Sequence, residues 1–405
     1  MTKATIYALT SALHDAQAID AHTREFLDSL HIDYDYRGGD FSDYGQHPLS
    51  IIYVRTGGTE GLFHRLLSTS LAIHRTPHSP HPVLLLASGK SNSLAAAMEI
   101  LSFLRQHQME GEIIHGSTPY ITQRITLLQR VADARQQLRG CRLGIIGKPS
   151  DWLISSQAEP AIIKERLGIE LIDIPMQELL DAINDPQPTS PITHDNNFPI
   201  YQALRTLIER YRLQGFTLRC FDLLGTVHDT GCMPLAYLNA EGYVAGCEGD
   251  VPAMLSMMIA RSLIAVSGFQ ANPATINPET GELLFAHCTI PLDMVERYEL
   301  DTHFESGIGT AIRGYMKPGP VTIFKVSGDL SRHFIAEGEL VRNQAKPDLC
   351  RTQQVIQLAD PSQAGYFLTN PIGNHHIILP GHLKTLLETF QKCTPEPTLL
   401  CSLNL

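Results

Sequence analysis

The stretch Gly246-Cys247-Glu248-Gly249-Asp250 places two carboxylates around a glycine, after the extended apolar run 243–245 and before a long apolar helix. Carboxylates beside so much apolar surface are costly unless a cation or hydrogen-bond donors meet them. The stretch therefore fits a divalent metal site or an acid–base pair. It also fits two acidic residues in the first turn of a helix, where the helix dipole favours negative charge.

Composition and charge exclude several classes of protein. The 405 residues are 43% hydrophobic and 18% charged, which is typical of a globular chain with room for two or three domains. A net charge of -11 without a cluster of Lys and Arg argues against a nucleic-acid partner. The longest apolar stretch, 251–269, contains Arg261 and several serines, so we expect a buried helix and no membrane partner. Eight scattered cysteines without CxxC spacing indicate reduced thiols and a cytoplasmic protein.

The pattern of apolar runs divides the chain into three expected domains. Residues 1–140 alternate short apolar runs with helical patterns, which is typical of a parallel sheet covered by helices, and residues 141–275 repeat this α/β pattern. Residues 276–369 contain short strands without intervening helices, which indicates an antiparallel sheet or small barrel. The final segment, 370–405, returns to α/β character, and we expect it to pack back on the second domain.

Two loops of the first domain are candidate ligand sites, because ligands of parallel sheets collect where strands end. One contains Thr56 and Gly57, and the other contains Asn92. Both are rich in groups that could hydrogen-bond a polyol or an anion, although turn chemistry alone also accounts for them.

Five separated motifs resemble, in content and order, the C-terminal half of the L-fucose isomerase family, which is distantly related to L-arabinose isomerase. The resemblance runs from about Cys220 to the C-terminus. The motifs are Cys247-Glu248-Gly249-Asp250, Ala286-His287-Cys288-Thr289, His303-Phe304-Glu305-Ser306-Gly307, Val321-Thr322-Ile323 and Gly373-Asn374-His375-His376.

This resemblance implies a fold, an assembly and an activity. The expected fold has two Rossmann-like parallel-sheet domains and an antiparallel β barrel-like domain. The expected assembly is a homo-oligomer, a trimer or hexamer, and the expected activity is aldose–ketose isomerisation of a small-molecule sugar. The implied cofactor is Mn²⁺, with Mg²⁺, Zn²⁺ and Co²⁺ as alternatives.

The resemblance also assigns metal ligands. Glu248 matches the first metal-binding carboxylate, His375 or His376 matches the late histidine ligand, and His287 resembles a further histidine ligand of the arabinose branch. The second acidic ligand of the family falls on Asn272. An amide oxygen can coordinate a metal, but it brings no charge and cannot act as a base.

Aldose–ketose exchange moves a proton between C1 and C2 through an enediol, so it needs a base and a group that polarises the carbonyl. Glu248 would be metal ligand and proton acceptor together. Asp250, Glu305 or Asp222 would take the other proton-transfer role, or the proton would move through water. His303 and Glu305, on one face of an expected alternating strand, could line the sugar pocket or form an exposed cross-strand pair.

Two alternative functions stay open. Asn272 suggests a sugar-binding relative that has lost isomerisation, and the same site could instead catalyse epimerisation through the same enediolate.

Overall fold

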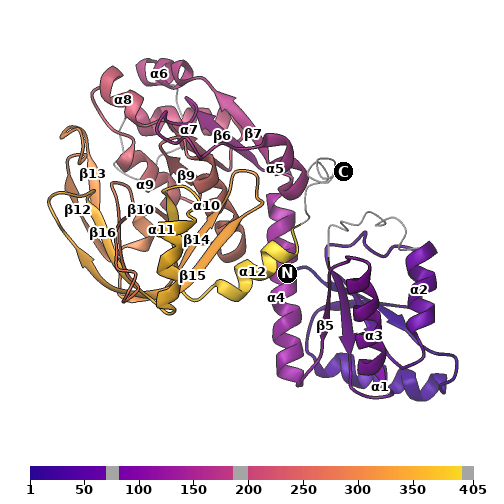
Figure 1. Ribbon diagram of the computed structural model, residues 1–405. Helices are drawn as coiled ribbons and strands as arrows, with labels where there is room; N and C mark the ends of the chain where they lie inside the picture. The colour runs from indigo at the N-terminus through magenta and orange to yellow at the C-terminus, as the bar shows by residue number, and fades with distance from the viewer. Residues whose placement is uncertain (70–81, 186–198, 395–405) are drawn as a thin grey trace. The chain divides into compact units, whose positions relative to one another are not determined.

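The computed structural model describes residues 1–69, 82–185 and 199–394 and divides the chain into two compact units (Figure 1). The first unit comprises residues 1–136 and the segment that starts at residue 388. The second unit comprises residues 137–387 and contains both a parallel sheet and a barrel.

The first unit is built on a five-stranded parallel sheet with the strand order β2-β1-β3-β4-β5. Every residue of β1 and β4 is buried, as expected for inner strands whose two faces are both covered by helices. The parallel sheet expected from the alternating pattern is confirmed. The strands are β1 (Ala4–Leu9), β2 (Tyr34–Gly38), β3 (Ser50–Val54), β4 (Val83–Ala87) and β5 (Gly111–Ile114), and the helices are α1 (Ala16–Ser29), α2 (Glu60–Thr69), α3 (Ser93–Gln106) and α4 (Thr118–Leu138).

The second unit begins with a four-stranded parallel sheet of order β7-β6-β8-β9. The chain runs outward from β6 to β7 and then returns to the other side of β6, so β6 and β8 flank the point where ligands of such sheets usually bind. The strands are β6 (Arg142–Ile146), β7 (Glu170–Ile174), β8 (Gly215–Leu218) and β9 (Val244–Cys247), and the helices are α5 (Pro160–Leu167), α6 (Met176–Asn184), α7 (Pro199–Tyr211), α8 (Phe221–Thr226), α9 (Cys232–Ala240) and α10 (Val251–Ile264).

Six antiparallel strands of the second unit close into a barrel in the order β10-β11-β16-β15-β14-β17. The barrel extends beyond the expected range 276–369, because closure requires β10 to pair with β17. The strands are β10 (Phe269–Ile276), β11 (Glu282–His287), β14 (Gly319–Val326), β15 (His333–Gln344), β16 (Thr352–Leu358) and β17 (His376–Pro380).

The remaining elements of the barrel region are short. Between β12 (Arg297–Asp301) and β13 (Ala311–Tyr315), which form a separate two-stranded sheet, His303 and Glu305 lie in a turn. The segment from residue 370 is divided: β17 completes the barrel, and α12 (Lys384–Lys392) ends in the part that groups with the first unit. The other short elements are η2 (Leu292–Met294), η3 (Pro361–Ala364) and α11 (Gly365–Thr369).

Helix α10 connects the parallel sheet to the barrel, which explains why it is apolar on nearly all faces. It contacts β8 and β9 on one side and β14 and β17 on the other (Figure 1). The helix is shorter than the apolar stretch 251–269, because Ala265 adopts a left-handed conformation that ends it and Phe269 starts β10. Burial between two layers thus accounts for the apolarity of this helix.

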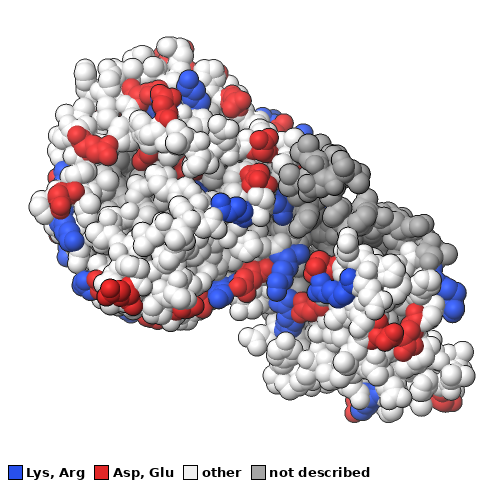
Figure 2. Space-filling view, viewed as in Figure 1, with Lys and Arg blue, Asp and Glu red and all other residues white. Residues whose placement is uncertain are grey.

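The charged surface is mixed. On the face shown in Figure 2, Lys and Arg side chains are interspersed with Asp and Glu. Within the described ranges, no helix combines the length and apolarity needed to cross a membrane.

Candidate metal centre

Glu248 is presented by a sharp turn between β9 and α10. Glu248 has a φ of 62° and Gly249 has a φ of 70°, so two consecutive residues are left-handed. A Cβ on Gly249 would lie 2.5 Å from the carbonyl oxygen of Lys148, which restricts this position to glycine. The backbone N–H of Ser150 donates to the Glu248 carbonyl over 3.0 Å. The loop after β6 and the turn after β9 therefore hold Glu248 in a conformation that costs a non-glycine residue about 1–2 kcal/mol.

Glu248, His287 and His375 form a buried cluster with ligand atoms within 4.8 Å of one another. Oε1 of Glu248 lies 3.7 Å from Nε2 of His287 and 3.4 Å from Nε2 of His375. Neighbouring ligands of an octahedral ion with bonds of about 2.1 Å are about 3 Å apart, so these separations need only small adjustments around an ion. The cluster could hold a metal ion.

Two buried nitrogen atoms of this cluster, Nδ1 of His287 and Nε2 of His375, lack a hydrogen-bond partner among the described residues, and so does the buried Oδ1 of Asn272 on the neighbouring strand β10. Strand β10 lies between β11 and β17, with Asn272 opposite Ala286 and Ala271 opposite His376. Asn272 therefore lies on the strand that separates the two histidine-bearing segments. Buried polar atoms are costly when unpaired, so this arrangement fits a ligand that the three segments share.

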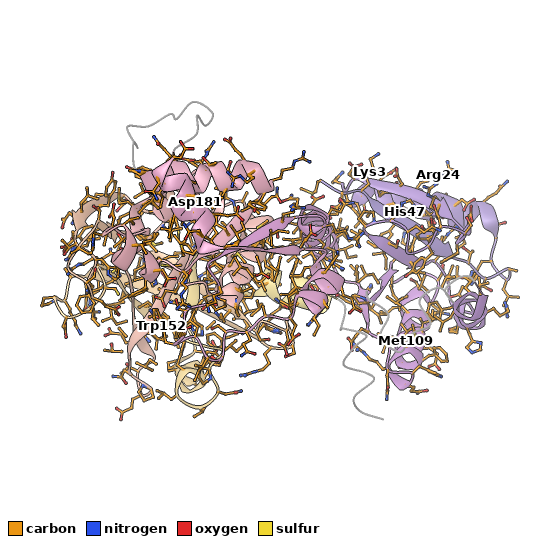
Figure 3. All side chains as sticks on the ribbon, turned by 90° about the horizontal axis from the view of Figure 1, so that it is seen from above. Lys3, Arg24, His47, Met109, Trp152 and Asp181 are labelled. Atoms are coloured by element: carbon orange, nitrogen blue, oxygen red, sulfur yellow. The ribbon has the colours of Figure 1, made fainter. Side chains whose placement is uncertain are left out.

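Trp152, in the loop after β6, fixes the other oxygen of the glutamate. Its Nε1–H donates a 2.8 Å hydrogen bond to Oε2 of Glu248, while its indole (labelled in Figure 3) is half exposed. The indole packs edge-on against Phe221 at 4.8 Å between ring centroids, and Phe221 packs against His303 at 5.3 Å. No motif of the sequence points to Trp152, although it is the single tryptophan of the chain and follows a strand and a glycine turn.

The charges of the cluster depend on one another. Burial opposes ionisation of Glu248, but His287 and His375 outweigh it and hold the pKa of this carboxyl well below its usual range. Burial likewise opposes protonation of His375, but its contacts with Asp250 and Glu248 raise its pKa to about 9. Without a metal, these pKa shifts favour an ionised Glu248 and a protonated His375.

Asp250 lies behind His375 and is completely buried. Burial raises its pKa, but Lys325 and His375 more than compensate and lower the pKa to about 2. The carboxylate also caps α10, because its Oδ1 accepts the backbone N–H of Ala253 over 2.8 Å. Asp250 therefore supports a histidine of the cluster and is closed to a substrate.

The structure separates the two adjacent histidines. His375 joins the cluster, whereas His376 points into the barrel core, with its ring 5.0 Å from that of Phe367. Nε2 of His376 pairs with the Tyr366 hydroxyl at 3.0 Å, and burial lowers the pKa of His376 to about 3. Because neighbouring residues of a strand point to opposite faces, only one of the pair can reach Glu248.

His303 and Glu305, two further expected site residues, lie outside the cluster of Glu248, His287 and His375. His303 is buried and its Nδ1 pairs with the Ser306 hydroxyl at 3.0 Å, while Glu305 is exposed in the same turn. This turn is linked to Trp152 through Phe221, so His303 lies at the edge of the aromatic group beside the cluster.

Thr56, Gly57 and Asn92 come together in the first unit. The Gly57 N–H donates to the Ser91 carbonyl over 2.7 Å, which joins the loops after β3 and β4. The Thr56 hydroxyl is buried and accepts the Ser11 N–H at 3.0 Å, so this side chain stabilises the loop. The two loops therefore lie side by side, and their substrate-binding role stays a prediction.

Comparison with known proteins gives no independent assignment. No protein-family model matches the chain, and no curated protein matches it significantly. The chemistry of the cluster and the five motifs are therefore the basis for a function.

Proposed function

We propose that this protein is a metal-dependent aldose–ketose isomerase that converts a small sugar through an enediol. The observation that carries the proposal is the buried cluster of Glu248, His287 and His375, with Asn272 on the strand between the two histidines. Glu248, His287 and His375 come from motifs that resemble the metal-binding motifs of the L-fucose isomerase family, and their ligand atoms lie within 4.8 Å of one another, which supports the proposal.

The donor set fits a first-row divalent ion. One carboxylate and two imidazoles suit Mn²⁺ or Zn²⁺ better than Ca²⁺, and we propose Mn²⁺, with Mg²⁺, Zn²⁺ and Co²⁺ as alternatives. Glu248, His287 and His375 would hold the ion, and the amide oxygen of Asn272 would be the fourth donor. When bound, the ion supplies Lewis-acid polarisation of the substrate carbonyl.

The chain's own residues divide the remaining tasks. Glu248 is ionised and can accept the proton that leaves the sugar carbon, while Trp152 holds the oxygen that does not face the histidines. Asn272 cannot accept a proton, and Asp250 is enclosed by its three partners. We therefore assign the second proton transfer to Glu305 or to water. Trp152 and Phe221 form an apolar wall that would exclude water from one side of the sugar.

The test is to incubate the Mn²⁺-loaded protein in D₂O with a panel of aldoses and to follow the C2 hydrogen and the ketose by proton NMR. Isomerisation predicts loss of the C2 signal together with ketose formation, and Glu248→Gln should abolish both. A C2 epimer without ketose would identify an epimerase. No exchange with any sugar would contradict an enediol mechanism.

One observation favours a second function, that of a sugar-binding relative without isomerase activity. The cluster holds one carboxylate, and the position between the histidine strands is an amide. A binder would show calorimetric heat with a sugar and no exchange of carbon-bound hydrogen. The resemblance further suggests a trimer or hexamer, and the scattered cysteines suggest a cytoplasmic protein. Light scattering in solution tests the assembly.

A further inference from the structure

Lys325 is a fully buried lysine on barrel strand β14. Its side chain is 1% exposed, and burial lowers its pKa despite a neighbouring carboxylate. That carboxylate belongs to Asp250, and both of its oxygens lie 3.5 Å from the Lys325 ammonium. Isosteric apolar replacements of buried ion pairs are often neutral or stabilising, so stability alone is a weak explanation for this pair.

Asp250 connects this lysine to the metal centre. Its Oδ2 accepts a 2.9 Å hydrogen bond from Nδ1–H of His375, while Oδ1 accepts the Ala253 backbone N–H. Each oxygen thus has its own donor and Lys325 contacts both, so rotation of the carboxylate would break at least one contact. Asp250 holds Nδ1 of the His375 ring, and Nε2 on the other side of the ring is directed at Glu248.

We propose that Lys325 and Asp250 are positioning residues that act through His375, locking its ring so that Nε2 is presented as a ligand atom. The metal-binding part of this inference rests on the proposed function. The physical reason is that a metal-binding imidazole is oriented by the acceptor on its other nitrogen, and outer partners of this kind typically affect metal affinity by about 10–100-fold. Asp250 is the acceptor that orients His375, and Lys325 in turn holds Asp250 in place.

The experiment compares Lys325→Met, Asp250→Asn and the double variant with wild-type protein and with Lys3→Met. Lys3 is an exposed lysine paired with Asp33 and Asp35, so it controls for the loss of an ordinary ion pair. Two properties are measured: calorimetric Mn²⁺ affinity, and the low-field NMR signal of the Nδ1 proton of His375 in ¹⁵N-labelled metal-free protein. The NMR signal of the Nδ1 proton can be measured without a bound metal and without enzymatic activity. Melting temperatures establish folding.

The proposal predicts at least a tenfold loss of Mn²⁺ affinity in Lys325→Met and Asp250→Asn, with loss or broadening of the Nδ1 proton signal, and no change in Lys3→Met. If Lys325→Met leaves Asp250 unpaired and does not fold, the double variant, which buries no charge at either position, should fold and show the same loss. Folded variants with wild-type affinity and an unchanged proton signal would overturn the proposal.

The two hypotheses fail separately. If wild-type protein binds no divalent cation but shows the Nδ1 proton and loses it in the variants, the positioning role stands and the metal-dependent function fails. If wild-type protein binds Mn²⁺ but the variants bind it equally well, the positioning role fails and the metal centre stands.

Discussion

The indole N–H of Trp152 donates a 2.8 Å hydrogen bond to the glutamate oxygen that faces away from the two histidines, Oε2 of Glu248. Because Trp152 is the single tryptophan of the chain, its selectively excited fluorescence comes from this one indole and reports on its surroundings, which include Glu248. We expect Zn²⁺, which is not paramagnetic, to shift the emission as Glu248 takes up the ion. The shift should saturate at one ion per chain and be absent in Glu248→Gln. An identical shift in that variant would place the ion elsewhere.

The left-handed backbone of Glu248 predicts an unusual order of stability. Alanine normally stabilises a chain relative to glycine, but at a φ of 62° the Cβ is unfavourable. Metal-free Glu248→Gly should therefore be more stable than Glu248→Ala by about 1 kcal/mol, although neither binds metal. Urea denaturation measures the difference. Greater stability of Glu248→Ala would mean that the turn relaxes out of the left-handed region.

The pH dependence of the metal-free protein should carry the signature of His375. Its pKa is raised from 6.5 to about 9, so folding takes up a proton between these values. The stability that this charge contributes is fully present below pH 6.5 and is lost as pH rises through about 9. We expect the melting temperature of metal-stripped protein to fall over this window, and the fall to be smaller in His375→Gln. Equal falls in both proteins would contradict the assigned charge.

Metal affinity should rise with pH, whereas the stability of the metal-free protein falls. The reason is that a proton and a metal ion compete for Nε2 of His375. Apparent Mn²⁺ affinity should rise with pH up to about 9, the pKa of His375, and level off above it. Calorimetry at several pH values, in buffers of different ionisation enthalpy, measures both the affinity and the proton released. A flat profile without proton release would exclude His375 as a ligand.

The sequence predicts the layers of this protein well, because period and composition are local properties. The alternating pattern of residues 1–140 and the short strands after residue 276 correspond to the parallel sheets and the barrel. The sequence predicts the closure of the barrel less well, because the pairing of β10 with β17 joins segments about a hundred residues apart. The apolarity of α10 on nearly all faces is explained only by the two layers that cover it.

In the candidate site too, the sequence predicts local features better than those that depend on distant segments. Glu248 and His287 are recognisable from short motifs, but the choice between His375 and His376 depends on which face of β17 meets the cluster. Trp152 and Lys325 carry no motif, and their roles come from contacts made by distant segments. The role of Asp250 is not predictable from the sequence either, because the Glu-Gly-Asp spacing does not specify which carboxylate joins the cluster.

Asn272 offers a gain-of-function prediction. Its Oδ1 is buried without a partner among the described residues, and Asn272→Asp would place a charged oxygen there at almost unchanged volume. We expect metal affinity to rise by about tenfold or more, because a carboxylate is a stronger ligand for a divalent ion than an amide. The metal-free variant should be less stable than wild type, since it buries an additional carboxylate without a partner. Unchanged affinity would place Asn272 outside the coordination sphere.

The most direct test of the metal centre is calorimetric titration of metal-stripped protein with Mn²⁺, with Glu248→Gln as the matched variant. Glutamine keeps the shape of the side chain and removes its charge. We predict one tight site per chain in wild-type protein and its loss in Glu248→Gln. No binding to wild-type protein, or equal binding to both proteins, would contradict a metal centre built on Glu248, His287 and His375.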